Sequence, residues 1–283
     1  MAIAPLDSYV DPDRVPYARC PLCASEALTL IGDADWTWKP DYQASLHPVI
    51  RWLACAACDH QITWGYHTPE ALDILLGSAL AGQTAEGMTA TDIEAARYAW
   101  AKVVDAVSHH AGTGRWLDVG AGAGMLAAVA AECGYDVVTM ELRAQVAEAL
   151  HARGFTVLRE DVTELLDGHA SVYDVISMCD VLEHVPFPRT ALQAVSHALR
   201  EDGMLFVSCP NRDSLAWRAL DAERGNPYWA EIEHYHNFSF RRLRTLLVEH
   251  GFEVLSCSVS NRHRVCMDVV ARRRGGPVLV TAV

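Results

Sequence analysis

The chain has 283 residues, of which 51% are hydrophobic, and a formal net charge of −13. This length and apolar content allow one large domain, or one domain with a small module, around a substantial core. The negative charge argues against nucleic acid as a partner, because an acidic surface repels phosphate backbones.

Membrane attachment is not expected from the sequence. No apolar run approaches the roughly 20 residues that span a bilayer. The first residues, MAIAPLDSYVDPDR, lack the basic start and apolar block of a signal peptide. We therefore expect a cytoplasmic protein without a membrane partner, whose nine cysteines are thiols or metal ligands rather than disulfides.

Two Cys-x-x-Cys pairs, Cys20 with Cys23 and Cys55 with Cys58, stand in the first part of the chain. Each pair can place two thiolates on one tetrahedral ion, and the two pairs together complete a closed four-sulfur zinc site. Because a closed site has no open position, we assign this zinc to folding rather than to chemistry. Chance spacing and redox-active pairs are the alternatives.

Between the cysteine pairs, the stretches WTW (36–38) and VIRWLAC (49–55) are typical of strands. Together with the cysteines they predict a zinc-ribbon-like module over residues 1–67. Residues 68–110 then show helical periodicity and predict a helical connection or cap. One helix is expected over 69–82 and a second over 90–110, joined by a glycine-containing stretch.

The second of these helices has two candidate N-caps, Thr91 and Asp92. Tyr98 and Trp100, on the same helix, are candidates to close one side of a site.

After residue 111 the pattern alternates between strands and helices and predicts a doubly wound α/β fold with a mostly parallel sheet of seven strands. The strands are expected at 115–120, 136–141, 156–160, 173–179, 203–209, 252–260 and 264–273. Helices are expected at 123–133, 143–153, 188–200 and 239–250. The last two strands are joined by only a few residues, so they must form a hairpin, and one of them must be antiparallel to the rest.

A glycine-rich loop, LDVGAGAGML (117–126), follows the first of these strands and opens a helix. Gly120, Gly122 and Gly124 let the backbone turn sharply and approach a ligand closely. Asp118 would repel a pyrophosphate resting on this turn, so the loop suits a ligand with a positive group. A tight turn without a ligand is the alternative.

Two further acids follow the next strands. Glu141, at the end of the second strand, can accept both ribose hydroxyls of a nucleoside. Asp161 follows the third strand, where an adenine amino group could be recognised. The pattern thus predicts a nucleoside-binding edge.

The stretch CDVLEHVPFP (179–188) follows the fourth strand and carries Asp180, Glu183 and His184. In doubly wound sheets ligands bind beyond the carboxyl ends of the strands, so these side chains should face the site. In one hypothesis His184 is a general base for a substrate hydroxyl, oriented by Glu183 or Asp180. In the other, the three residues bind a divalent metal that lowers the pKa of that hydroxyl.

His234 and His236 favour the metal hypothesis, because alternate residues of an extended segment point the same way. The predicted second metal site therefore consists of Asp180, Glu183, His184, His234 and His236. His236 is also a catalytic candidate. Structural, hydrogen-bonded histidines remain the alternative.

The motifs DVGAGAG, Glu141, EDV (160–162) and DVLEHV together resemble the class I S-adenosylmethionine-dependent methyltransferases, which have a Rossmann-like fold. The resemblance covers about residues 100–273 and implies the seven-stranded sheet with its final hairpin. It implies that Asp118 and the glycine loop hold the amino-acid part of the cofactor. Glu141 would bind the ribose, and Asp161 and Val162 would flank the adenine.

The cofactor site implied in this way consists of Asp118, Gly120, Ala121, Gly122, Gly124, Met125, Glu141, Leu142, Asp161, Val162 and Cys179.

Two methyltransferase groups carry a similar Glu-x-x-Glu-His after the fourth strand: small-RNA 2'-O-methyltransferases and the O-methyltransferases of ubiquinone synthesis. Metal dependence is known in both. This chain differs because Asp180, a shorter carboxylate, replaces the first Glu. A broader set of bacterial small-molecule methyltransferases has Glu-His there, Pro-Asn after the fifth strand (here Pro210 and Asn211) and a His-x-His-x-Phe-like segment, and not all of them need metal.

Residues 212–235 interrupt the run from the fifth strand to the next helix. They carry Trp217, Tyr228 and Trp229. An insert here would cover the substrate end of the cleft as a lid. Ordinary packing of these aromatic residues is the alternative.

From these observations we predict a methyltransferase domain over 111–283 that acts on a small-molecule acceptor. The resemblance favours a hydroxyl of a sugar, a phenol or a secondary-metabolite intermediate. One alternative is an rRNA or tRNA methyltransferase whose zinc module grips RNA. Another is a cofactor-binding regulatory protein without catalysis. A homodimer is left open.

Overall fold

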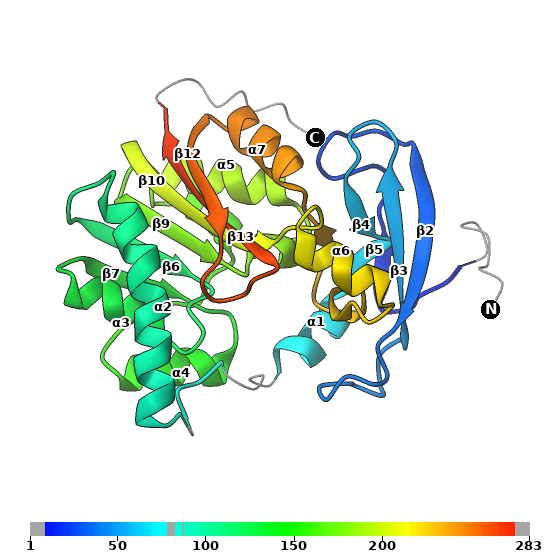
Figure 1. Cartoon of the computed structure of the whole chain (residues 1–283), viewed down its shortest axis with the longest axis horizontal. Helices are drawn as coiled ribbons and strands as arrows, with labels where there is room; N and C mark the ends of the chain where they lie inside the picture. The colour runs from blue at the N-terminus through cyan, green and yellow to red at the C-terminus, as the bar shows by residue number, and fades with distance from the viewer. Residues whose placement is uncertain (1–8, 78–82, 87, 275–283) are drawn as a thin grey trace.

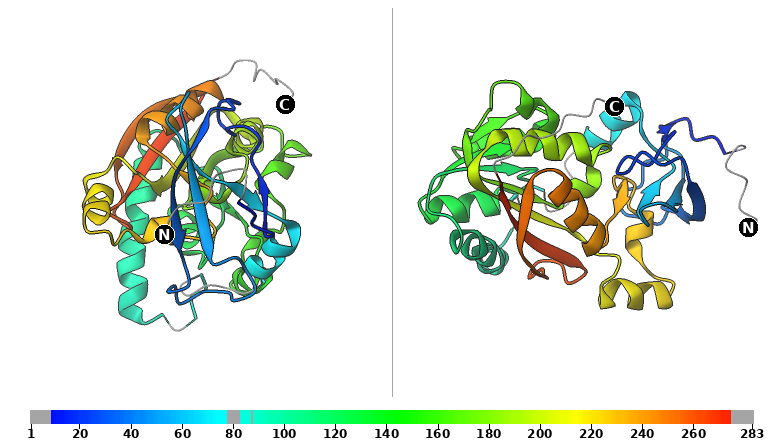
Figure 2. Two further views of the ribbon diagram at one scale, coloured as in Figure 1. Left: turned by 90° about the vertical axis from the view of Figure 1, so that its right-hand side faces the viewer. Right: turned by 90° about the horizontal axis from the view of Figure 1, so that it is seen from above.

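The computed structural model of the chain describes residues 9–77, 83–86 and 88–274. Two bodies lie side by side: a large sheet covered by helices and a smaller sheet built mainly from the N-terminal residues (Figure 1). The small sheet lies at the end of the molecule opposite α2 (Ala90–Ser108), as the right-hand view of Figure 2 also shows.

The large sheet has seven strands, as the periodicity predicts. In spatial order they are β12 (Phe252–Val259), β13 (Cys266–Arg273), β10 (Leu199–Pro210), β9 (Tyr173–Cys179), β6 (Arg115–Val119), β7 (Asp136–Met140) and β8 (Thr156–Leu158). The pairs among β10, β9, β6, β7 and β8 are parallel. β13 is antiparallel to both of its neighbours, so the predicted hairpin is confirmed.

Helices cover both faces of this sheet. They are α2, α3 (Met125–Glu132), α4 (Ala144–Ala152), α5 (Pro188–Ala198), α7 (Phe240–Glu249) and the short 3-10 helix η2 (Val162–Leu166). Consecutive strand residues point to opposite faces. Trp116 packs in the core cluster with α2 and α3, whereas Leu117 packs in the cluster with α5 and α7. The doubly wound fold class is therefore confirmed.

The smaller part contains a two-stranded and a four-stranded sheet. β1 (Arg14–Pro16) pairs with β5 (Gly65–His67). The four-stranded sheet has the order β11 (His236–Asn237), β4 (Gln61–Thr63), β3 (Val49–Cys55) and β2 (Leu28–Asp35). Because β11 comes from far along the chain, this sheet is not built from residues 1–67 alone.

One predicted strand of this module is wrong. Residues 36–38 form a turn after β2, because the Asp35 carboxylate accepts a hydrogen bond from the Thr37 N–H (2.8 Å). The Trp38 indole also donates back to the Asp35 carbonyl (2.9 Å). Such local side-chain bonds compete with a sheet ladder.

The helical connection differs from its prediction at two points. α1 (Pro69–Leu76) is capped by Gly77, and the predicted continuation over 78–82 lies outside the described residues. α2 begins at Ala90 as expected, but its N-cap is Thr89 rather than Thr91 or Asp92. Thr89 and Asp92 form a capping box, in which Asp92 accepts from the Thr89 N–H at 2.9 Å.

Three short helical segments complete the chain. η3 (Leu182–His184) follows β9. α6 (Leu215–Ala222) and η4 (Pro227–Ala230) form the insert before β11.

Candidate active site

A cavity of about 540 Å³ opens at the carboxyl ends of the parallel strands. Its wall includes Val119, Met140 and Cys179, which are the last residues of β6, β7 and β9. Loops that leave neighbouring strands in different directions create a crevice at this edge of a doubly wound sheet. The cavity therefore lies where the sequence places a ligand site.

Nearly all residues predicted to bind the cofactor line this cavity. They are Asp118, Gly120, Ala121, Gly122, Met125, Glu141, Leu142, Asp161, Val162 and Cys179.

Gly124, the remaining member of that set, does not line the cavity. It is the N-cap of α3 with a φ of 67°, in the left-handed region that favours glycine. A Cβ at this position would lie 2.5 Å from Leu150 Cδ2 on α4. The structure therefore assigns Gly124 to the packing of α3 against α4 instead of ligand contact.

Gly120 brings two loops of the site together. Its φ is 67°, and a Cβ there would lie 2.5 Å from Val181 Cγ2, in the loop after β9. The loops that follow β6 and β9 thus approach so closely that a side chain at residue 120 would force them apart.

Asp118 lies on the inner wall and is only 2% exposed. Its carboxylate accepts a hydrogen bond from Ser177 Oγ (2.7 Å) on the neighbouring strand. Burial raises the pKa of Asp118 to about 7. A positively charged ligand group beside it would favour the ionised carboxylate.

Glu141 is held by two backbone donors at the end of β7. It accepts from the Gly122 N–H (3.2 Å) and from the Arg143 N–H (3.0 Å). These bonds connect the glycine loop to the loop after β7. The carboxylate oxygens retain lone pairs that can accept ligand hydroxyls.

Arg262 is a site residue that the sequence analysis missed. It lies between β12 and β13, and one guanidinium nitrogen is 2.6 Å from Asp180 Oδ2. The guanidinium stacks on the Trp100 ring at 4.2 Å and lines the cavity. Its buried Nε and Nη2 have no partner among the described residues. β12 runs parallel to the central strands and ends at the same edge, a signal that could have placed residues 260–265 at the site.

Glu183, His184 and His234 form a cluster next to the cavity. One side-chain ligand atom from each lies within 4.8 Å of the other two. Glu183 is 1% exposed, and neither carboxylate oxygen has a partner in the described part of the chain. Burial raises its pKa well above the usual range. A bound cation or a retained proton would satisfy this carboxyl group.

His184 is the member of the cluster that lines the cavity. Its Nδ1 lies 3.8 Å from Glu233 Oε2, and Glu233 pairs with Arg143 at 2.6 Å. Burial lowers the pKa of His184, although Glu233 opposes this effect. The sequence analysis missed Glu233 and Arg143, because their pairing joins segments 90 residues apart.

The predicted five-residue metal site is not assembled as expected. Asp180, which has a left-handed φ of 56°, pairs with Arg262 instead of joining the cluster. His236 donates to the Val185 carbonyl (3.0 Å) and contacts His60 (3.0 Å). The alternation argument does not apply, because β11 begins at His236 and His234 lies outside it, so the two histidines do not share a strand.

The aromatic residues of the insert pack together instead of facing the cavity. Trp217 is buried, stacks on Tyr228 at 5.4 Å and contacts Trp229 at 5.6 Å. None of the three lines the cavity described above. The packing alternative therefore describes these aromatic residues. Glu233 and Tyr235 are the insert residues that line the cavity. On α2, Trp100 lines the cavity, whereas Tyr98 is 67% exposed.

The N-terminal part supplies another wall of the cavity. His67 of β5, together with Leu72, Leu75 and Leu76 of α1, faces it. Tyr235, beside β11, completes this side. An apolar surface with few polar groups suits a small organic molecule.

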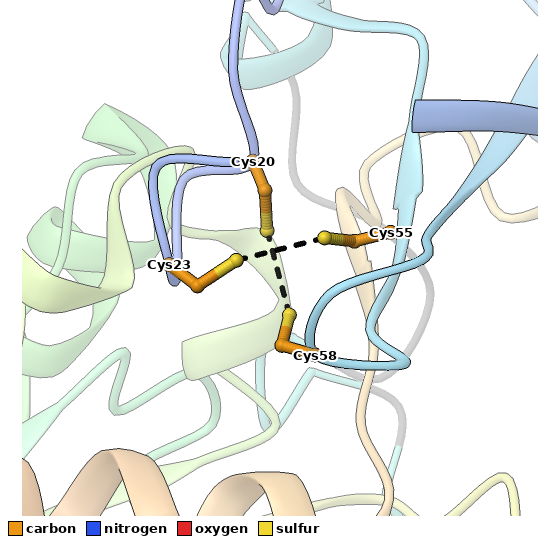
Figure 3. A group of neighbouring side chains, drawn as sticks. All are labelled: Cys20, Cys23, Cys55 and Cys58. Carbon is orange, nitrogen blue, oxygen red and sulfur yellow. Dashed lines mark hydrogen bonds between the residues drawn. The ribbon is translucent and has the colours of Figure 1, made fainter. Parts of the chain in front are cut away.

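The four cysteines lie around a common point, with their sulfur atoms directed toward one another (Figure 3). Cys20 and Cys58 Sγ are 3.7 Å apart, and Cys23 and Cys55 Sγ are 3.5 Å apart. A zinc ion with bonds of about 2.3 Å places the sulfurs of a tetrahedron roughly 3.8 Å from each other. The cluster therefore fits a closed four-sulfur zinc site.

In the described ranges, no helix is both long and apolar enough to cross a bilayer.

Residues 93–257 match the family model of the methyltransferase domain. The match covers more than half of the chain and agrees with the sheet order and the cavity. This chain belongs to the methyltransferase domain family.

Curated relatives resemble part of this domain. The ubiquinone biosynthesis O-methyltransferase of Pectobacterium atrosepticum is 38% identical over 107 residues, which cover 36% of this chain and 44% of the relative. The enzyme of the same name from Serratia proteamaculans is 35% identical over 107 residues, with the same coverage of 36% and 44%. The chain thus spans less than half the length of these relatives.

Solved structures share the fold. The 1,6-didemethyltoxoflavin-N1-methyltransferase of Burkholderia thailandensis, solved with 1,6-didemethyltoxoflavin and S-adenosylhomocysteine, has a TM-score of 0.54 and 21% identity. The alignment covers 76% of this chain and 96% of that one. A SAM-dependent methyltransferase of Archaeoglobus fulgidus has a TM-score of 0.50 and 16% identity, covering 63% and 94%.

Proposed function

We propose that this chain transfers a methyl group from S-adenosylmethionine to a hydroxyl of a small-molecule acceptor. One observation carries the proposal: the acid-flanked glycine loop and His184 line the same cavity. The family match supports methyl transfer. The name of the curated relatives, O-methyltransferase, supports oxygen as the acceptor atom.

The cavity wall fits the cofactor by its chemistry. Asp118 would face the cationic amino-acid end, Glu141 would accept the ribose hydroxyls, and Asp161 with Val162 would border the adenine. When bound, S-adenosylmethionine supplies an electrophilic methyl group on a positively charged sulfur. The protein then has to align the acceptor and remove its proton.

His184 would take that proton, because its side chain lines the cavity. Its lowered pKa keeps the imidazole neutral near pH 7, so that one ring nitrogen can accept a proton. Glu233 faces Nδ1 and would stabilise the imidazolium that forms. Bound S-adenosylmethionine would supply the methyl group to the acceptor oxygen, and His184 would hold the proton that the hydroxyl releases.

A divalent metal is the second mechanism that the cluster supports. Glu183, His184 and His234 offer one carboxylate and two imidazoles, a donor set that binds transition metals. A metal held there would lower the pKa of a bound hydroxyl. His184 cannot serve as ligand and base through the same nitrogen, so the two mechanisms are distinguishable.

The cysteine cluster would hold a structural zinc ion separately from this chemistry. Its four sulfurs leave no position open for an acceptor.

The first test is calorimetry with S-adenosylhomocysteine, followed by transfer of labelled methyl from S-adenosylmethionine to a panel of phenols, catechols and sugars. We expect His184→Gln to retain S-adenosylhomocysteine affinity and to lower turnover by about a hundredfold or more. His109→Gln, an exposed site at the end of α2, is the matched control. Failure of the chain to bind S-adenosylhomocysteine would refute the proposal.

The metal mechanism has its own test. Turnover lost on treatment with a mild chelator and restored by a transition-metal ion such as Mn²⁺ or Co²⁺ would favour it, provided that any zinc at the cysteine cluster stays in place. Chelator-resistant turnover would favour His184 as the base.

A further inference from the structure

The loop that carries Glu183 and His184 is held by segments outside the large sheet. The Glu183 carbonyl accepts from the Tyr235 N–H (2.8 Å), and the Val185 carbonyl accepts from His236 Nε2 (3.0 Å). The Pro186 carbonyl accepts from the Tyr17 hydroxyl (2.8 Å). Three carbonyls within four residues are thus bound from the side of the small sheet.

This loop has few bonds of its own. η3 is a single 3-10 turn of three residues, and short 3-10 turns have poor hydrogen-bond geometry. Pro186 and Pro188 carry no N–H groups, so they cannot extend the turn. The position of the His184 side chain therefore depends on external contacts.

Tyr17, the residue after β1, makes the contact farthest along this loop. Its side chain is 9% exposed, and its ring lies edge-on to Phe187 at 6.0 Å. Tyr66 of β5 contacts the same Phe187 ring at 5.0 Å, but its hydroxyl donates no hydrogen bond within the described ranges. The two tyrosines thus differ in a single polar contact to the loop.

A second connection runs from the cysteine cluster. A carbonyl can only accept, so His236 Nε2 donates to Val185 and its Nδ1 accepts from His60 Nε2. His60 is two residues after Cys58, and its carbonyl accepts from the Cys55 N–H (2.8 Å). The pairing of β4 with β11 places His236 opposite Ile62. Two buried imidazoles therefore join the zinc-binding turn to the loop.

We propose that the N-terminal module is a positioning element of the active site: Tyr17 and the His60–His236 pair hold the Glu183–Pro186 loop so that His184 faces the cavity. This role goes beyond a zinc module that only stabilises its own fold. The catalytic importance of His184 rests on the proposed function. The contacts that hold the loop can be tested without knowing the acceptor.

The test compares Tyr17→Phe with Tyr66→Phe by hydrogen exchange and mass spectrometry, both with S-adenosylhomocysteine bound. The His184 and Val185 amides bond to the Val181 and Leu182 carbonyls within the loop. In Tyr17→Phe we expect their peptide, 181–187, to exchange about two- to tenfold faster, the effect of one lost hydrogen bond. Tyr66→Phe should match the wild type, and S-adenosylhomocysteine affinity should change less than about twofold in both.

A spectroscopic signature tests whether His184 itself moves. In protein labelled at histidine carbon ε1, the His184 resonance is assigned by its loss in His184→Gln. It should shift in Tyr17→Phe but not in Tyr66→Phe. An unchanged resonance together with unchanged exchange of 181–187 would overturn the role of Tyr17, as would a rise in exchange spread evenly along the chain.

Cys23→Ser tests the connection through zinc. Loss of one ligand should loosen the turn that carries His60 and accelerate exchange of 181–187 together with the module. Faster exchange limited to residues 18–60 would overturn this connection. The role of Tyr17 would then depend on the result for Tyr17→Phe alone. A wild-type chain that does not bind S-adenosylhomocysteine would contradict the proposed function. The exchange comparison, repeated without ligand, would still show whether Tyr17 holds the 183–186 loop.

Discussion

Arg262 is the residue whose surroundings most clearly point to a ligand. One end of its guanidinium pairs with Asp180, and its face stacks on Trp100, so the group is fixed. Two of its donor nitrogens, Nε and Nη2, remain unpaired within the described chain. Asp118 and Cys179 lie on the same cavity wall. A carboxylate at the amino-acid end of the cofactor would satisfy these donors.

We expect Arg262→Met to weaken S-adenosylhomocysteine binding by about tenfold to a hundredfold, the range for a hydrogen bond to a charged group. Affinity for 5'-methylthioadenosine, which lacks the amino-acid portion, should stay within about twofold. Arg264→Met, an exposed arginine in the same turn, is the matched control. Calorimetry measures the affinity for both ligands. An equal loss of affinity for both would show that Arg262 supports the structure of the whole site rather than contacting the amino-acid portion.

At the scale of elements, the insert of α6 and η4 is attached firmly to its surroundings. Trp217 packs with Val265 and Cys266 at the start of β13. The Trp52 indole of β3 donates to the Trp229 carbonyl at 2.9 Å. The insert therefore bridges the hairpin of the large sheet and the small sheet, and its aromatic residues serve packing.

Trp217→Ala should lower the free energy of unfolding by about 3–5 kcal/mol, because it removes a large side chain that is 2% exposed. S-adenosylhomocysteine affinity of the folded protein should be unchanged, since Trp217 does not line the cavity. Leu215→Ala, on the same helix but 78% exposed, should change stability by at most about 0.5 kcal/mol. Urea unfolding measures both. A stable Trp217→Ala variant with weakened ligand binding would instead support a lid.

At the scale of the whole molecule, the turns that carry the four clustered cysteines share a core with the large sheet. Cys20, Leu22 and Cys55 pack in the same hydrophobic cluster as Leu117 of β6 and Leu243 of α7. β11 of the methyltransferase half completes the small sheet. The two parts should therefore unfold together.

A strong chelator should remove zinc and lower the temperature of a single unfolding transition. The reason is that a metal ion held only by the native state stabilises that state against unfolding. Cys23→Ser should reproduce the effect, whereas Cys133→Ser, an exposed cysteine outside the cluster, should not. Circular dichroism and metal analysis make the measurement. Two transitions, of which only the one insensitive to S-adenosylhomocysteine responds to zinc, would show independent domains.

Much of this architecture could be predicted from the sequence. Strand and helix periodicity, the final hairpin and the positions of Gly120 and Asp118 depend on residues close together in the chain. The WTW strand was predicted wrongly because local side-chain bonds of Asp35 outweighed strand propensity. His236 lies outside the predicted metal cluster because its ring nitrogens bond to Val185 and His60, which are distant in the sequence.

The sequence by itself determined the seven-stranded sheet, the acid-flanked glycine loop and the paired cysteines, since periodicity, backbone conformation and ligand spacing act over a few residues. Only the tertiary structure decided that Arg262 lines the cavity and pairs with Asp180, that Glu233 lies beside His184 and pairs with Arg143, and that Tyr17 donates to the Pro186 carbonyl. Those neighbours lie far apart along the chain, and their meeting depends on how the two sheets pack against each other.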